Sequence, residues 1–228
     1  MIDQRKKHGC WLLCNSGKFC MGLNTNEQRN LQDKWKKRRV RKDSSICHFG
    51  DDFHSFFAVK TGSFKSFVNT EDGREQIINF HFPGDLIALE SIALGYFRST
   101  VKSLEDSIIC QIPYVEAVKV ISPYSEELNP LVNLLSVKIN QDVRIFPSAT
   151  GVEKLAEFLL YYHFRLDEIF SFSFPMSRAE IANFLGLSTE TISRLFSKMQ
   201  KQGVIKVSGK KITILDVRNL KKMCPFSG

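Results

Sequence analysis

The sequence predicts an α+β protein with three consecutive parts: an antiparallel β-sandwich or β-roll, one long helix and a winged helix-turn-helix. In the first part, short apolar runs alternate with turn signals roughly every ten residues, which is typical of antiparallel β-structure. In the second part apolar residues recur at heptad spacing, and in the third two capped helices precede a hairpin. The length of 228 residues fits one large domain or two small ones.

The composition excludes several classes of protein. The chain is 43% hydrophobic and 25% charged, as expected of a globular protein rather than a disordered or fibrous one. No apolar run approaches the roughly 20 residues of a membrane span, and no apolar stretch of signal-peptide length follows the charged N-terminus. We therefore expect a cytoplasmic protein without a membrane segment. The net charge of +8 points to a polyanionic partner, either nucleic acid or an anionic membrane surface.

The β-rich part is expected to extend from Val40 to Pro113. Turn signals divide it at Thr61-Gly62, Glu71-Asp72-Gly73 and Pro83-Gly84-Asp85. The strands expected between these turns include Phe56–Val59, Ser63–Val68, Gln76–Phe80 and Ile108–Ile112. The basic run Lys34–Lys42 is expected to be a solvated helix face that leads into the first strand, and a second nucleic-acid surface is the alternative.

A long helix is expected from about Pro123 to Phe146, where Pro147 ends it. Its seam positions are separated by 4, 3, 4, 3 and 4 residues: Leu128, Val132, Leu135, Ile139, Asp142 and Phe146. This heptad spacing indicates either packing on the helix's own domain or a two-stranded dimer contact. In a symmetric dimer Asp142 would face its own copy, and the two carboxylates would repel each other. Such a dimer contact would be weak and therefore adjustable.

The third part carries the signals of a helix-turn-helix. Ser177 and Glu180 form a capping box, so a helix is expected to begin at Arg178, and Gly186 suits its C-terminal cap. Ser188 is expected to cap a second helix that ends near Gln202. After Gly203, the runs Val204–Val207 and Lys211–Leu215 flank Ser208-Gly209-Lys210, which predicts a hairpin wing.

The second helix carries a candidate DNA-reading face. Glu190, Ser193 and Arg194 stand at positions i, i+3 and i+4, so they share one face near the start of the helix. Arginine can bind guanine bidentately, and glutamate can accept from a cytosine or adenine amino group. Candidate phosphate contacts are Thr189, Thr191, Ser197, Lys198, Lys210 and Lys211. A solvated Glu–Arg pair is the alternative, but the caps, turn, wing and basic charge together favour DNA binding.

With these features the chain resembles the CRP/FNR family of bacterial transcription regulators, from Cys20 to Leu215. The FNR branch reads DNA with a Glu-x-x-Ser-Arg arrangement, which Glu190, Ser193 and Arg194 match. Phe80–Ala88 and Ser107–Pro113 resemble further FNR segments. The resemblance implies a homodimer that binds TTGAT-like inverted repeats and contacts RNA polymerase. It also implies four parts: a cysteine-rich segment (1–22), a cyclic-nucleotide-binding-like β-roll sensor (23–122), a dimerisation helix (123–147) and the winged helix-turn-helix (148–228).

The six cysteines are the candidate sensor. Cys10, Cys14 and Cys20 are spaced C-x3-C-x5-C, and the resemblance implies that they and Cys110 hold an oxygen-labile [4Fe–4S] cluster. The family's first two ligands are commonly separated by two residues, whereas three separate Cys10 from Cys14. From the residues alone, Cys110 alternates with Ile108 and Ile112 and suits a small core residue equally well. Cys47 and Cys224 match no ligand position and are expected to be non-ligands.

Three rival functions start from the same residues. Arg98-Ser99-Thr100 resembles the phosphate-binding motif of cyclic-nucleotide receptors, but Ala88-Leu89-Glu90 replaces the companion Gly-Glu. The cysteines would also serve a thiol switch or a zinc site. An iron–sulfur enzyme is the third rival, but Cys20 lies too far from Cys14 for the radical-SAM pattern, and the chain has no other catalytic motif. We therefore expect no enzymatic activity.

Overall fold

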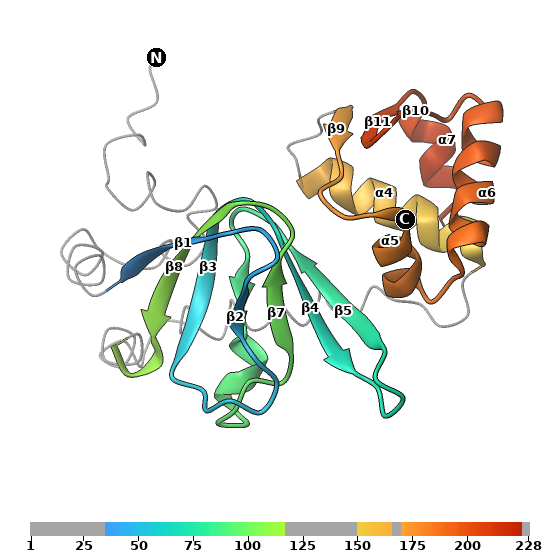
Figure 1. Cartoon of the computed structure of the whole chain (residues 1–228). Coiled ribbons are helices and arrows are strands. Elements are labelled where there is room, and N and C mark those ends of the chain that lie inside the picture. Colours follow the sequence, from blue (N-terminus) through green and yellow to red (C-terminus); the bar gives the residue numbers. More distant parts are fainter. Residues whose placement is uncertain (1–34, 117–149, 166–169, 225–228) are drawn as a thin grey trace, which may run out of the picture. The chain divides into compact units, whose positions relative to one another are not determined.

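The computed structural model describes residues 35–116, 150–165 and 170–224 (Figure 1). The chain divides into two compact units between Gln141 and Asp142, and each is described here by itself. The expected cysteine-rich segment (1–22) and dimerisation helix (123–147) lie outside the described residues. None of the described helices is both long and apolar enough to cross a membrane.

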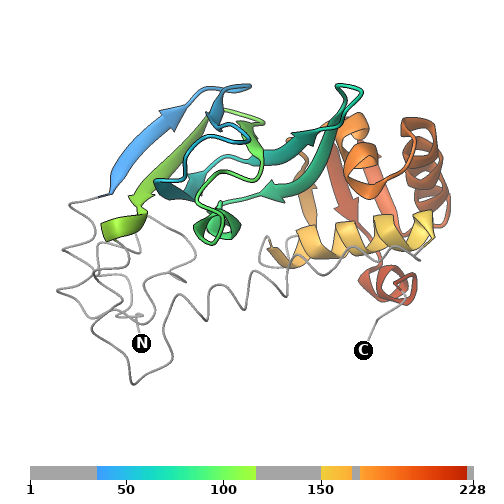
Figure 2. The ribbon, with the colours of Figure 1, turned by 90° about the horizontal axis from the view of Figure 1, so that it is seen from below.

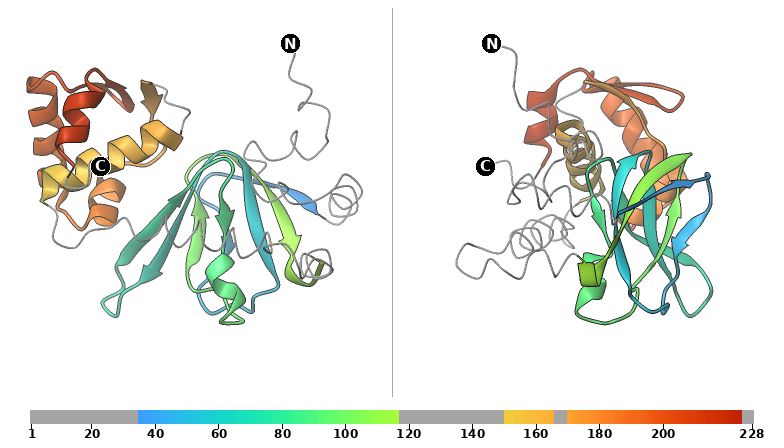
Figure 3. Two further views of the ribbon diagram at one scale, coloured as in Figure 1. Left: turned by 180° about the vertical axis from the view of Figure 1, so that it is seen from behind. Right: turned by 90° about the vertical axis from the view of Figure 1, so that its left-hand side faces the viewer.

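The described part of the first unit is built from two four-stranded antiparallel sheets, with strand orders β1-β8-β3-β6 and β2-β7-β4-β5 (Figure 3). A short 3-10 helix, η3 (Leu89–Ile92), follows β6. The runs expected as strands fall within β3, β4, β5 and β8, so this part of the prediction is confirmed. The strands are β1 (Lys36–Val40), β2 (Ser45–Cys47), β3 (Ser55–Thr61), β4 (Phe64–Asn69), β5 (Glu75–His81), β6 (Leu86–Ile87), β7 (Thr100–Ser103) and β8 (Ser107–Pro113).

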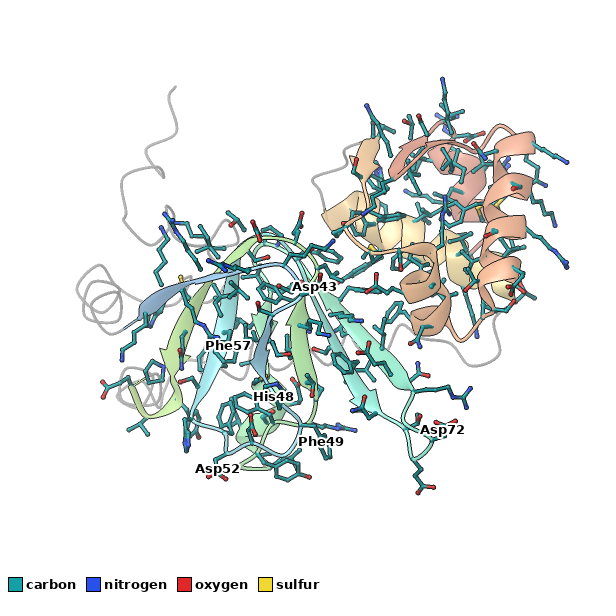
Figure 4. The ribbon with its side chains drawn as sticks, viewed as in Figure 1. Asp43, His48, Phe49, Asp52, Phe57 and Asp72 are labelled. Carbon is teal, nitrogen blue, oxygen red and sulfur yellow. The ribbon has the colours of Figure 1, made fainter. Side chains whose placement is uncertain are left out.

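The core of this unit lies between the two sheets and follows the two-residue alternation of strand side chains. Phe57 and Val59 of β3 and Ile109 of β8 belong to the core cluster, together with Cys47 of the opposite sheet. Figure 4 shows Phe57 among the strands, whereas His48, Phe49 and Asp52 lie at the loop end of the unit. The alternate residues of the same two strands face the other way and are nevertheless buried: Phe56, Ala58, Cys110 and Ile112. The β3–β8 pair is therefore covered on both of its faces.

The expectation of a helix at the basic run is wrong for Lys36–Val40. These residues form β1, the edge strand that pairs antiparallel with β8. Val40 is buried in the core cluster, whereas the four cations before it are exposed. Cationic side chains on an edge strand discourage pairing with other chains, which makes this sequence suitable for an edge.

The second unit contains four helices and a three-stranded sheet of order β10-β11-β9 among its described residues (Figure 2). Phe158 and Tyr162 of α4 pack on Phe172 and Phe174, with ring centroids 4.5–6.3 Å apart. This aromatic cluster joins α4 to the sheet. The elements are α4 (Gly151–Arg165), β9 (Ser171–Ser173), α5 (Arg178–Leu185), α6 (Thr189–Lys201), β10 (Ile205–Ser208), β11 (Lys211–Ile214) and α7 (Val217–Lys222).

The expected capping box is present at the start of α5. The Ser177 hydroxyl oxygen accepts from the Glu180 backbone N–H at 3.2 Å, and a Glu180 carboxylate oxygen accepts from the Ser177 backbone N–H at 2.7 Å. Gly186 ends the helix in the left-handed region, with φ of 66°. The predicted boundaries of α5 and the predicted Ser188 cap of α6 are confirmed.

Replacing Ser177 with alanine is expected to lower the free energy of unfolding by about 1 kcal/mol, because two N-terminal N–H groups lose their partners. Ser177→Thr keeps a hydroxyl acceptor at the same position and serves as the control. Urea unfolding of the full chain, followed by circular dichroism, measures both variants. Equal midpoints for Ser177→Ala and the parent protein would contradict a stabilising cap.

Candidate nucleic-acid interface

The turn between α5 and α6 sets the start of the second helix. The Leu187 backbone N–H donates to Ala182 O at 2.9 Å, which closes the turn after Gly186. Ser188 then caps α6, because its Oγ accepts from the Thr191 backbone N–H at 3.1 Å. The first turn of α6 is thereby held in one orientation relative to α5.

One side of α6 is buried and the other is exposed. Ile192, Phe196 and Met199 are buried in the core of the unit, as expected for Ile192 and Phe196. Leu195, also expected in the core, is half-buried. The opposite side carries polar side chains directed away from the unit (Figure 4). The expected DNA-contacting residues on this exposed side are Thr189, Glu190, Ser193, Arg194, Ser197 and Lys198, while Thr191 is half-buried.

The exposed side of α6 also forms a shallow, open hollow. Four of its lining residues were expected from the sequence, and Lys201 and Gln202 extend it toward the end of the helix. Lys201 is exposed and adds a cation that the sequence reasoning did not single out. The hollow is lined by Ser193, Arg194, Ser197, Lys198, Lys201 and Gln202.

The protonation and hydrogen bonds of this face determine what it can recognise. The pKa of Glu190 is lowered, first by its own backbone N–H and the Ser188 hydroxyl, and also by the charge of Arg194. Glu190 is therefore an acceptor at neutral pH, whereas Arg194 offers only donors. The hydroxyls of Ser193 and Ser197 donate to the carbonyls four residues earlier, each at 2.9 Å. Their oxygens are thus oriented to accept, and a phosphate contact by Ser197 requires its hydroxyl to rotate.

The expected wing is confirmed as the β10–β11 hairpin. Gly209 turns it with φ of 60°, and Lys210 and Lys211 are exposed at its tip. The Val207 backbone N–H donates to Gln200 Oε1 of α6 at 2.8 Å, which ties the wing to the second helix. The two cations and the exposed side of α6 therefore belong to one rigid frame.

Arg178 is a site residue that sequence reasoning missed. Its guanidinium carbon lies 3.3 Å from the centroid of the Phe196 ring on α6, in a cation–π contact. Its Nη1 is buried and has no hydrogen-bond partner among the described residues, and burial lowers the pKa of this guanidinium. The contact joins the first residue of α5 to the middle of α6. No local pattern reveals it, since the two residues meet only after the turn has folded.

Cys110 lies on β8, and the other expected ligands Cys10, Cys14 and Cys20 lie outside the described residues. Cys110 is 2% exposed, and its direct cross-strand neighbours are Ala58 on one side and Lys37 on the other. It faces away from the core cluster between the sheets. This position fits a thiol ligand beside an edge strand. In the described part of the chain, no three His, Cys, Asp or Glu side chains come together as a metal site.

Cys47 and Cys224 differ from the ligand pattern in their surroundings. Burial raises the pKa of the Cys47 thiol to about 12, and its Sγ contacts Ser99 O at 3.9 Å within the core. Burial, together with the charges of Glu157 and Glu153, raises the pKa of Cys224 to about 11. Both thiols are therefore protonated at neutral pH, in keeping with the expectation that they are non-ligands.

The rival anion site around Arg98 retains only part of its expected chemistry. Arg98 is exposed just before β7, and its backbone N–H donates to Ser91 Oγ at 3.3 Å. Leu89 is buried at 2% exposure and offers no polar group. The expected dimer contacts cannot be placed, because they lie outside the described residues: Leu128, Val132, Leu135, Ile139, Asp142 and Phe146.

Two family models match the chain. The Crp-like helix-turn-helix domain matches residues 153–223, and the cyclic nucleotide-binding domain matches residues 37–124. They cover the second unit with α6 and its wing, and the β-sandwich of the first unit. The sequence boundaries of both matches therefore follow the division seen in the structure.

Curated proteins and solved structures match over most of the chain. The anaerobic regulatory protein of Haemophilus influenzae is 32% identical, over 91% of this chain and 84% of its own length. The transcriptional activator protein FnrA of Stutzerimonas stutzeri is 33% identical, over 94% and 91%. Electron transport regulator A of Shewanella oneidensis is 34% identical, over 96% and 95%. The structure of FixK2 from Bradyrhizobium japonicum superimposes with a TM-score of 0.73 at 27% identity, covering 83% of this chain and 97% of that one.

Proposed function

Because the chain belongs to the CRP/FNR family of transcription regulators, we propose that it is an oxygen-responsive FNR-type regulator that binds TTGAT-like inverted repeats as a homodimer. The family consists of DNA-binding regulators rather than enzymes, and the chain has its Crp-like helix-turn-helix domain. The relatives named as anaerobic or fumarate and nitrate reduction regulators support the FNR branch. Acting on chromosomal DNA, the protein would work in the cytoplasm.

The observation that carries the DNA assignment is the exposed row Glu190, Ser193 and Arg194 on a capped, amphipathic helix. A TTGAT half-site offers a guanine to the donors of Arg194 and base amino groups to the carboxylate of Glu190. Lys198, Lys210 and Lys211 would bind phosphates beside these base contacts. The row thus supplies both selective recognition and electrostatic attachment.

Dimerisation explains why two half-sites are read together. The heptad seam of the segment 123–147 is proposed as the contact between two copies, with the sensor at 23–122 and the DNA-binding part at 148–228. A dimer presents its second helices about 34–36 Å apart, one turn of DNA. Asp142 opposes the contact by facing its own copy. A weak dimer of this kind responds to any group that adds stability to the paired state.

Cys10, Cys14, Cys20 and Cys110 are proposed to hold the [4Fe–4S] cluster, and the buried Cys110 beside β1 supports its part in this set. A bound cluster would supply an oxygen-labile cross-link between four thiolates. Cys110 would anchor the segment 1–22 to the β-sandwich, and this attachment would offset the Asp142 repulsion. Loss of the attachment in oxygen would weaken the dimer and release DNA. While bound, the dimer would contact RNA polymerase.

The test is an absorption spectrum of protein purified without oxygen, with iron and sulfide assayed per chain before and after air. We expect a broad band near ~400–420 nm and about four irons per chain, both lost in air. Cys110→Ser is expected to abolish the band and the iron, whereas Cys224→Ser retains both. A colourless, iron-free protein that still binds TTGAT repeats would contradict the sensor and leave the DNA-binding assignment intact.

A second candidate is a regulator of the same fold without a cluster, controlled by a small ligand such as a cyclic nucleotide or by a thiol or zinc switch. The match to the cyclic nucleotide-binding domain and the exposed Arg98 favour the ligand version. Calorimetric titration of the iron-free protein with cyclic AMP and cyclic GMP, beside an Arg98→Gln variant, measures this binding. Heat that disappears in the variant would select the ligand version.

A further inference from the structure

The pairing of β1 with β8 places one cation directly beside the proposed cluster ligand on that strand. In this antiparallel register Lys37 is opposite Cys110, Arg38 is opposite Ile109, and Lys36 is opposite Gln111. Side chains of directly opposed residues lie on the same face, with Cβ atoms about 4.5–5.5 Å apart. Lys37 and Cys110 therefore share a face, whereas Lys36 and Arg38 occupy the other one.

Two further observations agree with this assignment of faces. Val40, which alternates with Lys36 and Arg38, belongs to the core cluster between the sheets, as does Ile109. The charge of Arg38 acts on Cys47, which lies in that same core. Cys110 is absent from the core cluster although it is 2% exposed. The face of Lys37 and Cys110 is thus the one that turns away from the opposite sheet.

We propose that Lys37 is an electrostatic partner of the iron site and slows the loss of its iron, an inference that rests on the proposed function. Four thiolates around a [4Fe–4S] cluster leave a net charge of about −2, whereas four protonated thiols are neutral. A cation beside Cys110 therefore favours the loaded site over the empty one. The Lys37 side chain is exposed, so water and salt weaken its effect without removing it.

The bland explanation is that the cations of β1 only protect a sheet edge from pairing with other chains. That explanation treats Lys36 and Lys37 alike, because both are exposed on the same strand. The electrostatic role separates them, since only Lys37 shares the face of Cys110. The two lysines are therefore a matched pair that differs in the face alone.

The experiment compares the full chain with its Lys37→Gln and Lys36→Gln variants, all purified without oxygen. Iron release to a ferrous chelator is followed by absorbance under anaerobic conditions, at low and at high salt. We expect Lys37→Gln to release iron about two- to fivefold faster than the parent protein, with the difference shrinking at high salt. Lys36→Gln is expected to match the parent, and Lys37→Arg to restore its rate.

Urea unfolding of the iron-free proteins supplies the structural readout. Equal midpoints for the parent and both variants are expected, because the proposed role exists only in the loaded site. Equal iron release from Lys37→Gln and Lys36→Gln, or a loss of iron-free stability confined to Lys37→Gln, overturns the proposal while the cluster assignment stands. A parent protein that takes up no iron overturns the proposed sensor and this role together.

Discussion

Arg194→Ala is expected to remove selective DNA binding while leaving most of the non-selective attraction in place. A bidentate arginine–guanine contact is worth about 1–3 kcal/mol, and a dimer makes it twice, so the Kd for a TTGAT inverted repeat should rise at least about 30-fold. Arg194→Lys keeps the charge but loses the planar pair of donors, so it should lose most of the selectivity as well. Fluorescence anisotropy with the inverted repeat and a shuffled duplex, at fixed salt, measures both affinities.

Lys210→Ala provides the matched contrast from the wing. Lys210 is exposed and is proposed to bind a phosphate, so its loss should weaken binding to the repeat and to the shuffled duplex by the same factor. It should also reduce the steepness of the salt dependence. If Arg194→Ala instead weakened both duplexes equally, the proposed base contact would be wrong.

Gly62→Ala is expected to destabilise the first unit by about 2–5 kcal/mol, from about 1–2 kcal/mol for a side chain in the left-handed region and about 1–3 kcal/mol for overpacking. Gly62 has φ of +81°, and a Cβ there would lie 2.0 Å from Ser107 Oγ and 2.9 Å from Ser107 Cα. The side-chain oxygen can move, but the Cα belongs to the first residue of β8. A loss of this size is a large part of a typical domain's stability.

Gly73→Ala separates the two causes. Gly73 has a similar φ of +79°, but nothing lies within 4 Å of the position of its Cβ. It should therefore lose only about 1–2 kcal/mol, and both replacements restrict the unfolded chain to the same extent. Urea unfolding compares the two variants with the parent. Equal losses at positions 62 and 73 would show that the contact with Ser107 is harmless.

The parts of the fold that local signals specify were predictable. The boundaries of α5 and α6 follow from Ser177, Glu180, Gly186 and Ser188, because caps act within one turn of the chain. The exposed row on α6 followed from helical periodicity for the same reason. The role of that row in reading DNA stays a prediction, since periodicity gives a face and not a partner.

The features that depend on distant residues were missed or mistaken. Lys36–Val40 contains one apolar residue, so no alternation marks it as a strand, and its pairing with β8 supplies the missing information. The Arg178–Phe196 contact likewise needs the folded turn. Alternation left Cys110 open between a core residue and a ligand, because only the register shows which of its neighbours share its face.

The central position of β8 also has a consequence for how a signal can travel. The strand is hydrogen-bonded to β1 on one side and to β3 on the other, and Ile109, Cys110 and Ile112 are buried along it. Backbone amides in such a strand open only in the rarest fluctuations of a domain, so their exchange with solvent is slow. Cys110 therefore sits on a stationary reference point. Whatever is fastened to it moves against a fixed base, and the message is carried by the fastened segment rather than by deformation of the sheet.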